Sequence, residues 1–405
     1  MSILNELDNQ AQWQAFYAYK CEKSHLSKAD ETFLRQFIEN EGYKPVVESM
    51  LKGQNFSIPA KRYLNKHGKS KKRVVYTYTE QENTVLKLVA FLLYRYDDAQ
   101  PPNCYSFRRH YGAKKAIHTL MQVTGIAAKY TCKLDIKDYF NSIDVELLLP
   151  ILREVLWDDE PLYAFFDKLL AADQAVCDGI TIAEKRGAMA GIPISQFFAN
   201  IYLAEIDRYF MDAGVLYARY SDDIIFFADT GEQLAEYLIV VETFLAKYHL
   251  EVNPEKVRMT APYEKWDYLG IAFDNGQIGL SDATLKKIKG KIRRKARSIY
   301  RWKNRKGAAD AHVMRVFARS MNRKFFGKDE NDEFTWARWF FPLITTDHDL
   351  KAIDAYMQEH IRYLSSGHFT KANYKIRYSD LKACGYRSLV NEYYRFKQGQ
   401  PFHIE

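Results

Sequence analysis

Apolar residues of the first sixty positions recur at spacings of three and four, as at Leu34, Phe37 and Ile38. This spacing predicts short amphipathic helices, because residues three and four apart share one face of a helix. The pattern then changes to the basic stretch KRYLNKHGKSKKRVVYTY. Its Gly68 and flanking polar residues predict a hairpin turn that leads into a strand over residues 74–78.

Strand and helix patterns alternate through the middle of the chain. Residues 85–93 are apolar on nearly every side, which predicts a buried helix. The stretch KYTCKLDI predicts a strand, and NSIDVELLLPIL predicts a helix with Asn141 or Ser142 as its N-cap. Residues 197–211 have the spacing of another helix.

The stretch LYARYSDDIIFF places Asp222 and Asp223 between two runs with the composition of strands. LAEYLIVVETFLAKYHL then predicts a helix, and DYLGIAF predicts a short strand. This irregular alternation favours a mixed α+β unit over a regular parallel βαβ array.

The chain becomes strongly basic from Ser281 onward, in TLKKIKGKIRRKARSIYRWKNRK. Apolar residues at spacings of three, four and seven predict one buried helix face, and the other faces carry mostly lysine and arginine. A merely solvated helix commonly interleaves acidic partners, so this single sign favours nucleic acid. Candidate nucleic-acid contacts are Lys287, Lys291, Arg294 and Arg297. The remainder to Glu405 reads as helical, with an interruption at Gly385.

The composition indicates a cellular compartment and a class of binding partner. The net charge is +8, concentrated in the basic segments, which indicates a polyanionic partner. The five cysteines are widely spaced without a CxxC pair, which argues against disulfides and zinc and favours a reducing, cytoplasmic setting. The N-terminus has no signal-peptide pattern, and no run is long enough for a membrane span.

Two predicted strands end on carboxylates, one at Asp135 and one at the pair Asp222 and Asp223. Adjacent aspartates in a turn can simply be solvated. Carboxylates delivered together by two strand ends instead suit Mg²⁺ or Mn²⁺, which can stabilise a phosphoryl displacement.

Five segments in order give a more specific interpretation: KLDIKDYFNSID, GAMAGIPISQFFANIYL, YSDD, LEVNPEKVRM and DYLGI. Over roughly residues 61–275 they resemble the ordered motifs of a reverse transcriptase palm. The resemblance implies a right-hand polymerase with fingers, palm and thumb. The implied parts are a helical N-terminal extension (1–60), fingers (61–125), palm (126–280, with finger insertions around 145–190) and a thumb with C-terminal helices (281–405).

The resemblance also implies roles for single residues. Asp135, Asp222 and Asp223 would be the catalytic metal ligands, and Phe140 would be the steric gate that rejects a 2′-hydroxyl. Asp138 is either a shared acidic position or a solvated loop residue. Lys66 and Arg73 would bind the triphosphate, and Lys69, Lys71 and Lys72 are alternative candidates for that role. Lys256 would be the proton donor to the pyrophosphate. The other implied substrate contacts are Ala190, Gly191 and Gln196. Arg108 and Arg109 would contact template phosphate.

The second motif departs from the family, since Met189-Ala190-Gly191 replaces the usual Pro-Gln-Gly. The architecture resembles standalone bacterial reverse transcriptases of the unknown-group, defence-associated type. That resemblance implies deoxynucleotide substrates, a cDNA product and a structured noncoding RNA as template. The alternatives are a template-independent DNA polymerase of abortive-infection type, a diversity-generating retroelement enzyme, and a catalytically idle RNA-binding scaffold.

Overall fold

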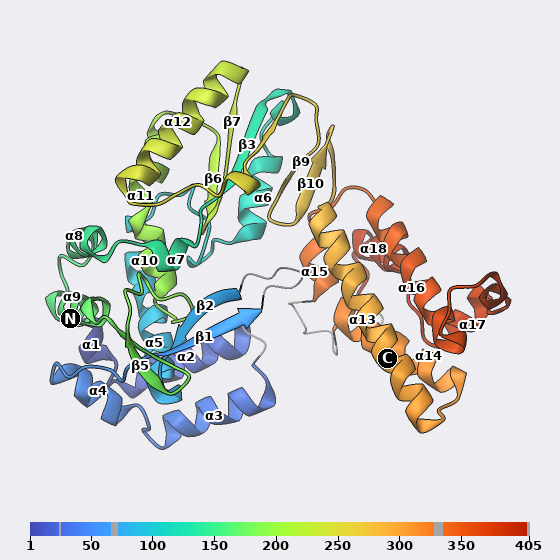
Figure 1. Ribbon diagram of the computed structural model, residues 1–405, viewed down its shortest axis with the longest axis horizontal. Helices are drawn as coiled ribbons and strands as arrows, with labels where there is room; N and C mark the ends of the chain where they lie inside the picture. The colour runs from blue at the N-terminus through green and yellow to red at the C-terminus, as the bar shows by residue number, and fades with distance from the viewer. Residues whose placement is uncertain (24–25, 66–71, 328–334, 403–405) are drawn as a thin grey trace. The chain divides into compact units, whose positions relative to one another are not determined.

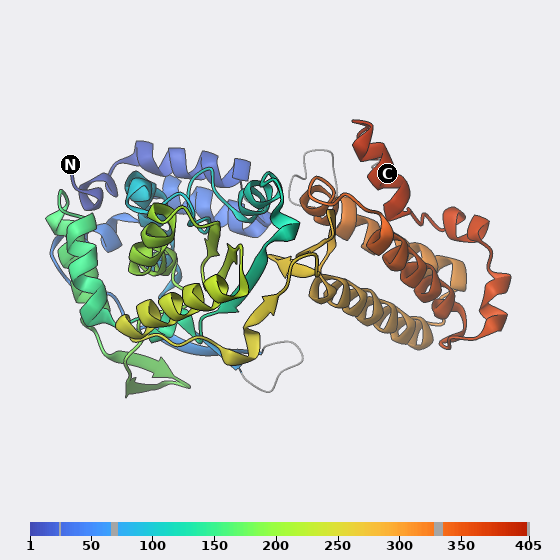
Figure 2. The ribbon, with the colours of Figure 1, turned by 90° about the horizontal axis from the view of Figure 1, so that it is seen from above.

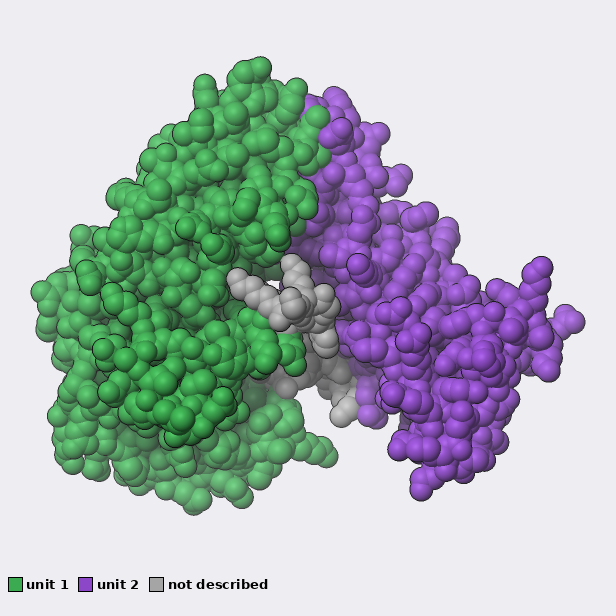
Figure 3. All heavy atoms as spheres, viewed as in Figure 1, with its two compact units in different colours: residues 1–116, 129–261 green, residues 117–128, 262–405 purple. Residues whose placement is uncertain are grey.

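The computed structural model describes residues 1–23, 26–65, 72–327 and 335–402. These residues form two compact units, coloured separately in Figure 3. Unit 1 contains residues 1–116 and 129–261, and unit 2 contains residues 117–128 and 262–405. Within the described ranges, no helix combines the length and the apolarity that a membrane crossing requires.

The N-terminal helices of unit 1 pack around one buried helix. They are α1 (Ile3–Glu6), α2 (Gln10–Lys23), α3 (Lys28–Glu39) and α4 (Lys44–Leu51). The buried helix is α5 (Glu80–Leu92), which α1, α2 and α4 contact, and α3 packs on α2 (Figure 1). Trp13 stacks on Tyr43 with ring centroids 4.7 Å apart and donates a hydrogen bond to the Leu7 carbonyl. Thr79 and Glu82 form a capping box that fixes the start of α5. The predicted helical N-terminus and buried helix are confirmed.

A four-stranded sheet of order β2-β1-β4-β5 follows. Its strands are β1 (Ala60–Asn65), β2 (Lys72–Thr77), β4 (Gln174–Cys177) and β5 (Ile180–Ala183). The strand predicted over residues 74–78 is therefore confirmed within one residue at its end. The turn predicted at Gly68 lies outside the described residues.

The central sheet of unit 1 has the order β6-β7-β3-β8. Its strands are β3 (Tyr130–Asp135), β6 (Tyr217–Tyr220), β7 (Asp223–Ala228) and β8 (Arg258–Thr260). β3 and β7 are antiparallel, in a register that pairs Asp135 with Asp223. The helices α10 (Ser195–Tyr202), α11 (Ala204–Asp212) and α12 (Gly231–Lys247) accompany it. The ring of Phe210 on α11 stacks on Tyr217 and Phe226 and meets Tyr237 of α12 edge-on, so both helices cover the same face.

Shorter elements link these layers. They are η1 (Leu93–Ala99), α6 (Ala113–Met121), η2 (Ile126–Ala128), α7 (Tyr139–Ser142), α8 (Val145–Val155), α9 (Glu160–Ala171) and η3 (Pro254–Lys256). The N-cap predicted at Asn141 or Ser142 is wrong, because those residues lie inside α7. The cap of α8 is Asp144, whose carboxylate accepts a hydrogen bond from the Glu146 amide.

Two further predictions differ from the structure. The helix predicted over residues 197–211 is two helices, because the backbone of Leu203 (φ −110°, ψ 13°) leaves helical geometry between α10 and α11. The strand predicted from DYLGIAF is a hairpin, because Leu269 (φ 48°) and Gly270 (φ 89°) form a tight turn. Its strands are β9 (Trp266–Tyr268) and β10 (Ile271–Asp274).

Unit 2 joins this hairpin and β11 (Gln277–Leu280) to a group of helices, seen from a second side in Figure 2. The helices are α13 (Asp282–Lys306), α14 (Asp310–Phe326), α15 (Trp336–Phe340), α16 (His348–Ser366), η4 (Lys371–Lys375), α17 (Tyr378–Ala383) and α18 (Leu389–Lys397). α13 contacts both α14 and α16 and buries Ile288, Ile292 and Ile299. The predicted amphipathic basic helix, the α+β class and the break at Gly385 are confirmed.

A buried ion pair lies beside the central sheet. Arg219 on β6 and Asp207 on α11 have fully buried side chains joined through two nitrogens, and the Nε to Oδ1 distance is 2.8 Å. Tyr217 also donates its hydroxyl to Asp207, at 2.9 Å. The remaining guanidinium donors reach the carbonyls of Asn200 and Ser221 at 3.0 and 3.3 Å. These bonds compensate the desolvation of both charges.

We expect Asp207→Asn to destabilise the protein by about 3–5 kcal/mol, because it leaves the Arg219 charge buried without its counterion. Urea unfolding followed by circular dichroism measures this change. Asp212→Asn, at an exposed position of the same helix, is the control and should stay within about 0.5 kcal/mol of wild type. Equal stability of the two variants would contradict the importance of the pair.

Candidate active site

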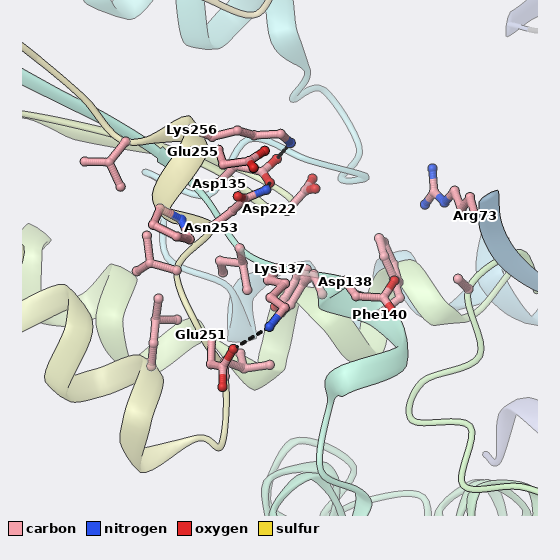
Figure 4. Close-up of a pocket in the computed structure, with 18 of the residues that line it drawn as sticks. Arg73, Asp135, Lys137, Asp138, Phe140, Asp222, Glu251, Asn253, Glu255 and Lys256 are labelled. Carbon is pink, nitrogen blue, oxygen red and sulfur yellow. Dashed lines mark hydrogen bonds and ion pairs between the residues drawn. The ribbon is translucent and has the colours of Figure 1, made fainter. Parts of the chain in front are cut away.

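The edge of the central sheet opens into a cavity of about 1290 Å³ within unit 1 (Figure 4). Its lining includes the predicted Asp135 and Asp222, the predicted Phe140 and Arg73, and Lys256. These residues come from β3, the β6–β7 turn, α7, β2 and η3. The structure therefore brings together side chains that the sequence separates by up to 183 positions, from Arg73 to Lys256.

The turn that carries Asp222 is held by its backbone. Ser221 has a left-handed conformation (φ 60°), and its amide donates to the Ser106 hydroxyl at 2.9 Å. Its carbonyl accepts from Arg219, at the buried pair described above. The amide of Ile136 donates to the Asp222 carbonyl at 3.1 Å, which fixes this turn against the end of β3. Asp222 is consequently placed beside Asp135, as Figure 4 shows.

The clustered carboxylates repel one another. Burial and, to a smaller extent, the nearby charges of Asp223 and Asp135 together raise the pKa of Asp222 to about 6. Lys256 acts in the opposite direction and forms an ion pair with the Asp135 carboxylate. Asn253 also anchors this edge, since its amide donates to the Asp135 carbonyl at 2.8 Å. The Lys256 ammonium group thus acts on both Asp135 and Asp222.

The chemistry of these donors fits a hard divalent cation, because carboxylate oxygens are the ligands that Mg²⁺ and Mn²⁺ prefer. The pKa of Asp222 is raised mainly by burial and further by the charges of Asp223 and Asp135, so a bound cation would stabilise its ionised form. Among the residues that the structure describes, no three His, Cys, Asp or Glu side chains are arranged as a ready metal-binding group. The arrangement therefore supplies the donors but has Lys256 bound to one of them.

Phe140 is held in place by the hydrogen bonds of its neighbour Asn141, and we call this set of bonds the Asn141 frame. The Asn141 side chain accepts from the Ala190 amide at 3.1 Å and donates to the Val74 carbonyl on β2 at 3.3 Å. The Ala190 carbonyl in turn accepts from the amide of Tyr76, at 2.8 Å. This frame joins α7, β2 and the loop at Ala190. Sequence reasoning considered Asn141 only as a helix cap and missed it, because both of its partners are far away in the sequence.

The glycines of this loop are required by close approach. At Gly191 (φ 110°) a Cβ atom would lie 2.8 Å from the Tyr76 carbonyl oxygen. At Gly187 (φ 54°) it would lie 2.7 Å from the Phe140 carbonyl oxygen. Ala190 itself is 2 % exposed but lines the cavity with its neighbours. The predicted Ala190 and Gly191 are therefore at the site, with their backbones held against β2.

Other predicted residues are more dispersed. Arg73 is exposed on β2, across the cavity from the carboxylates in Figure 4. Lys72 also lines this cavity, whereas Lys66, Lys69 and Lys71 lie outside the described residues. Asp138 is exposed with a left-handed backbone (φ 47°) and lines the cavity as well. Gln196 instead lines a different cavity of unit 1, together with Tyr19 and Phe91.

The two predicted template arginines differ from each other. Arg108 is 8 % exposed and donates to the carbonyls of Pro101, Cys104 and Asp97 at 2.7 to 3.1 Å. The prediction that it contacts phosphate is wrong for this structure, because its guanidinium is buried among these acceptors. Arg109 is exposed, with its guanidinium over the rings of Phe91 and Tyr94.

The predicted basic residues of α13 lie in unit 2. Lys287, Arg294 and Arg297 are exposed, and Lys291 is half-buried. Burial lowers the pKa of Lys291, and the positive charges of Lys324 on α14 and of Lys287 lower it further. Such a cluster of like charges is stabilised by a bound polyanion.

Comparison with known proteins gives the following matches. The family model described as reverse transcriptase (RNA-dependent DNA polymerase) matches residues 64–273. A search of curated protein sequences finds no match. Similar solved structures include apo telomerase from Candida tropicalis, at 12% identity over 89% of this chain and 72% of that one, with a TM-score of 0.47.

Two further telomerase structures are similar at the same level. Candida tropicalis apo telomerase truncated from its C-terminal domain has 13% identity over 56% of this chain, with a TM-score of 0.45. The present chain covers 55% of that one. Candida albicans telomerase in complex with a TWJ fragment of telomeric RNA has 11% identity over 91% of this chain and 69% of that one, with a TM-score of 0.43.

We expect Asp222→Asn to stabilise the protein in chelator by about 1–2 kcal/mol at pH 7.5, because it removes a charge that burial and two carboxylates disfavour. A carboxyl whose pKa is raised on folding, here from 3.8 to about 6, lowers stability as pH rises through that window. The difference between variant and wild type should therefore grow between pH 4 and 6 and then level off.

Chemical unfolding across pH measures this difference. The control is Asp173→Asn, which changes an exposed carboxylate of the same unit and should leave the pH profile of wild type unchanged. A variant that is less stable than wild type at pH 7.5 would show that the carboxylates do not repel one another as described.

Proposed function

The chain belongs to the reverse transcriptase (RNA-dependent DNA polymerase) family, and we propose that it adds deoxynucleotides to a DNA strand on an RNA template at the cavity of Figure 4. The observation that carries this proposal is the register of β3 and β7. It pairs Asp135 with Asp223 and leaves Asp222 in the adjoining turn, and Asp135 and Asp222 both line a cavity wide enough for a nucleotide.

We assign Asp135, Asp222 and Asp223 as ligands of two Mg²⁺ ions, with Mn²⁺ as a possible substitute. When bound, the ions lower the pKa of the primer hydroxyl and neutralise charge on the reacting phosphates. The carboxylates of the chain orient these charges before the substrate arrives, which avoids reorganisation during the reaction. The Asp135 to Lys256 ion pair must open for the full donor set to become available.

Arg73 and Lys256 complete the electrostatics around the triphosphate. Phosphoryl transfer needs mainly positioning and charge neutralisation, and Arg73 supplies a bidentate cation from the side of the cavity opposite the carboxylates. Lys66 is proposed as its partner. Lys256, once released from Asp135, carries a proton that the departing pyrophosphate can accept.

Phe140 is proposed to select the sugar. A ring in this position blocks a 2′-hydroxyl, the group that distinguishes ribonucleotides from deoxyribonucleotides. The side chain at 190 is alanine and offers no hydrogen bond, so nucleotide recognition relies on the gate and on base pairing. The other contacts proposed from the sequence are Gly191 and Gln196 for the substrate and Arg109 for the template.

The template partner is proposed to be a structured noncoding RNA. Its support is the basic helix α13, where Lys287, Lys291, Arg294 and Arg297 lie, and the half-buried Lys291 among like charges. We further propose the fingers, palm and thumb ranges given above and the standalone bacterial, antiphage type, supported by resemblance of the motifs. The five free cysteines support a cytoplasmic location.

We expect Asp222→Ala combined with Asp223→Ala to reduce DNA synthesis by about 1000-fold or more while RNA binding persists, because the cation ligands are lost and the basic surfaces remain. Primer extension on a defined RNA and filter binding measure the two properties. The matched control is Glu251→Gln, since Glu251 lines the same cavity but pairs with Lys137 at 2.8 Å. Full DNA synthesis by the double variant would refute the proposal.

We expect Phe140→Ala to raise the ratio of ribonucleotide to deoxynucleotide incorporation by roughly 10- to 100-fold, because the space for a 2′-hydroxyl opens. Single-nucleotide incorporation kinetics with matched triphosphates measure the ratio. Phe244→Ala, which removes a half-buried ring outside the cavity, is the control. An unchanged ratio in a folded, active Phe140 variant would show that the gate lies elsewhere.

A further inference from the structure

Unit 2 has a small cavity of its own, of about 260 Å³, far along the sequence from the catalytic aspartates. Its lining comes from α13, from α16 and from the segment that follows α16. The lining residues are Arg297, His360, Tyr363, Gly367, His368 and Phe369. It combines a cation, two imidazoles and two aromatic rings in a space that suits a single base.

His360 gives the cavity a specific hydrogen-bonding group. Its side chain is buried, at 2 % exposure, and its Nδ1 lies 2.8 Å from the carbonyl oxygen of Tyr356. Because a carbonyl only accepts, Nδ1 carries a proton, and burial lowers the pKa of the ring, which favours its neutral form. Nε2 is then an acceptor, and it has no hydrogen-bond partner among the described residues. A buried acceptor without a donor is unfavourable, and a bound donor would remove this cost.

Phe369 gives the cavity an open stacking surface. Its ring is 62 % exposed, yet it is held in a stack on Tyr363 with centroids 5.0 Å apart and planes at 22°. It also meets the His360 ring edge-on, at 5.1 Å. An exposed aromatic face held rigidly in this way is suited to stack a nucleobase.

Positive charge accompanies the rings along one side of α13. Arg297 lines the cavity, and Arg293, one turn earlier, is close enough to lower the pKa of His360. Lys289, one further turn back, lies over the ring of Tyr356 at 5.6 Å. The spacing of four residues places all three on one helical face. A nucleic-acid backbone that follows this face would meet a cation at each turn.

The wall of the cavity is rigid. Lys303 donates to the carbonyls of Leu364 and Ser365 at 2.9 and 2.7 Å, which satisfies the C-terminal end of α16. Gly367 has a left-handed backbone (φ 75°), and a Cβ atom there would collide with the Tyr300 ring. These contacts tie the end of α16 to α13 and hold the Phe369 segment in place.

We propose that this cavity binds one unpaired nucleotide of an RNA strand. The base stacks on Phe369, a donor of the base edge or the ribose hydroxyl bonds to Nε2 of His360, and the adjoining phosphate pairs with Arg297. The three features together match a nucleotide, because each addresses a different part of it. The inference rests on the proposed function only in taking RNA as the strand that unit 2 holds.

The test compares Phe369→Ala with Tyr374→Ala. Tyr374 is equally exposed, at 61 %, and its ring lies under Arg362 outside the cavity, so it controls for loss of an exposed aromatic ring. Fluorescence anisotropy with single-stranded poly-U and poly-A RNA of about 15 nucleotides measures binding. We expect Phe369→Ala to weaken binding by about 5- to 50-fold and Tyr374→Ala to change it less than about twofold. Equal affinities of the two variants would overturn the proposal.

A second arm tests stacking directly and identifies the source of the nucleotide. Oligonucleotides with abasic sites should lose affinity for wild type but not for Phe369→Ala, because that variant has already lost the stack. Equal losses in both proteins would overturn the proposal. AMP is the mononucleotide probe. If Phe369→Ala weakens AMP binding but not RNA binding, the cavity is a site for free nucleotides and the proposal for RNA is wrong.

Primer extension at saturating RNA separates this inference from the proposed function. Phe369 lies outside the catalytic cavity, so the variant should keep the wild-type rate once RNA is saturating. Weakened RNA binding with normal extension supports the inference. If wild type itself makes no DNA while Phe369→Ala still loses RNA affinity, the catalytic proposal fails and the nucleotide site stands.

Discussion

The buried ion pair of Arg219 and Asp207 is the interaction on which the position of the Asp222 turn depends. Two charges without solvent are tolerated only when every donor and acceptor around them is satisfied. Here that requirement recruits the carbonyls of Asn200 and Ser221 and the hydroxyl of Tyr217. The same bonds that compensate the charges therefore fix the backbone immediately before Asp222. The ion pair therefore contributes both to the stability of unit 1 and to the geometry of the turn that carries Asp222.

The acidic cluster beside this turn differs from the buried pair, because its like charges repel one another. Strand register brings Asp135 and Asp223 together next to Asp222, and Lys256 forms an ion pair with Asp135. Folding concentrates negative charge here at a cost to stability, and perturbed carboxylates of this kind are typical of functional sites. Lys256 reduces that cost in the absence of ligands and must move when they bind. The turn is therefore held firmly by the Arg219 bonds on one side, while the carboxylates on its other side repel one another.

The sequence predicted the fold class, the central strands, the basic helix and the meeting of Asp135 with Asp222, because these follow from periodicity and from motif order. The sequence did not predict features that depend on backbone geometry or on partners far away in the chain. The break at Leu203 and the turn at Gly270 depend on backbone geometry that apolar spacing does not report. Arg108 reads as a surface cation, and only the carbonyls around it show that it is structural. Gln196 belongs to the second motif yet lines another cavity, since the direction of α10 rather than sequence distance sets where its side chain lies.

The Asn141 amide links the segment before it to β2 and to the loop at Ala190. Phe140 consequently has no independent position, because it moves with whatever moves that frame. A change in β2 or in the loop at Ala190 would therefore shift the Phe140 ring without altering the ring itself. If Phe140 selects the sugar as proposed, substitutions that alter this selection should occur in these two segments as well as at position 140.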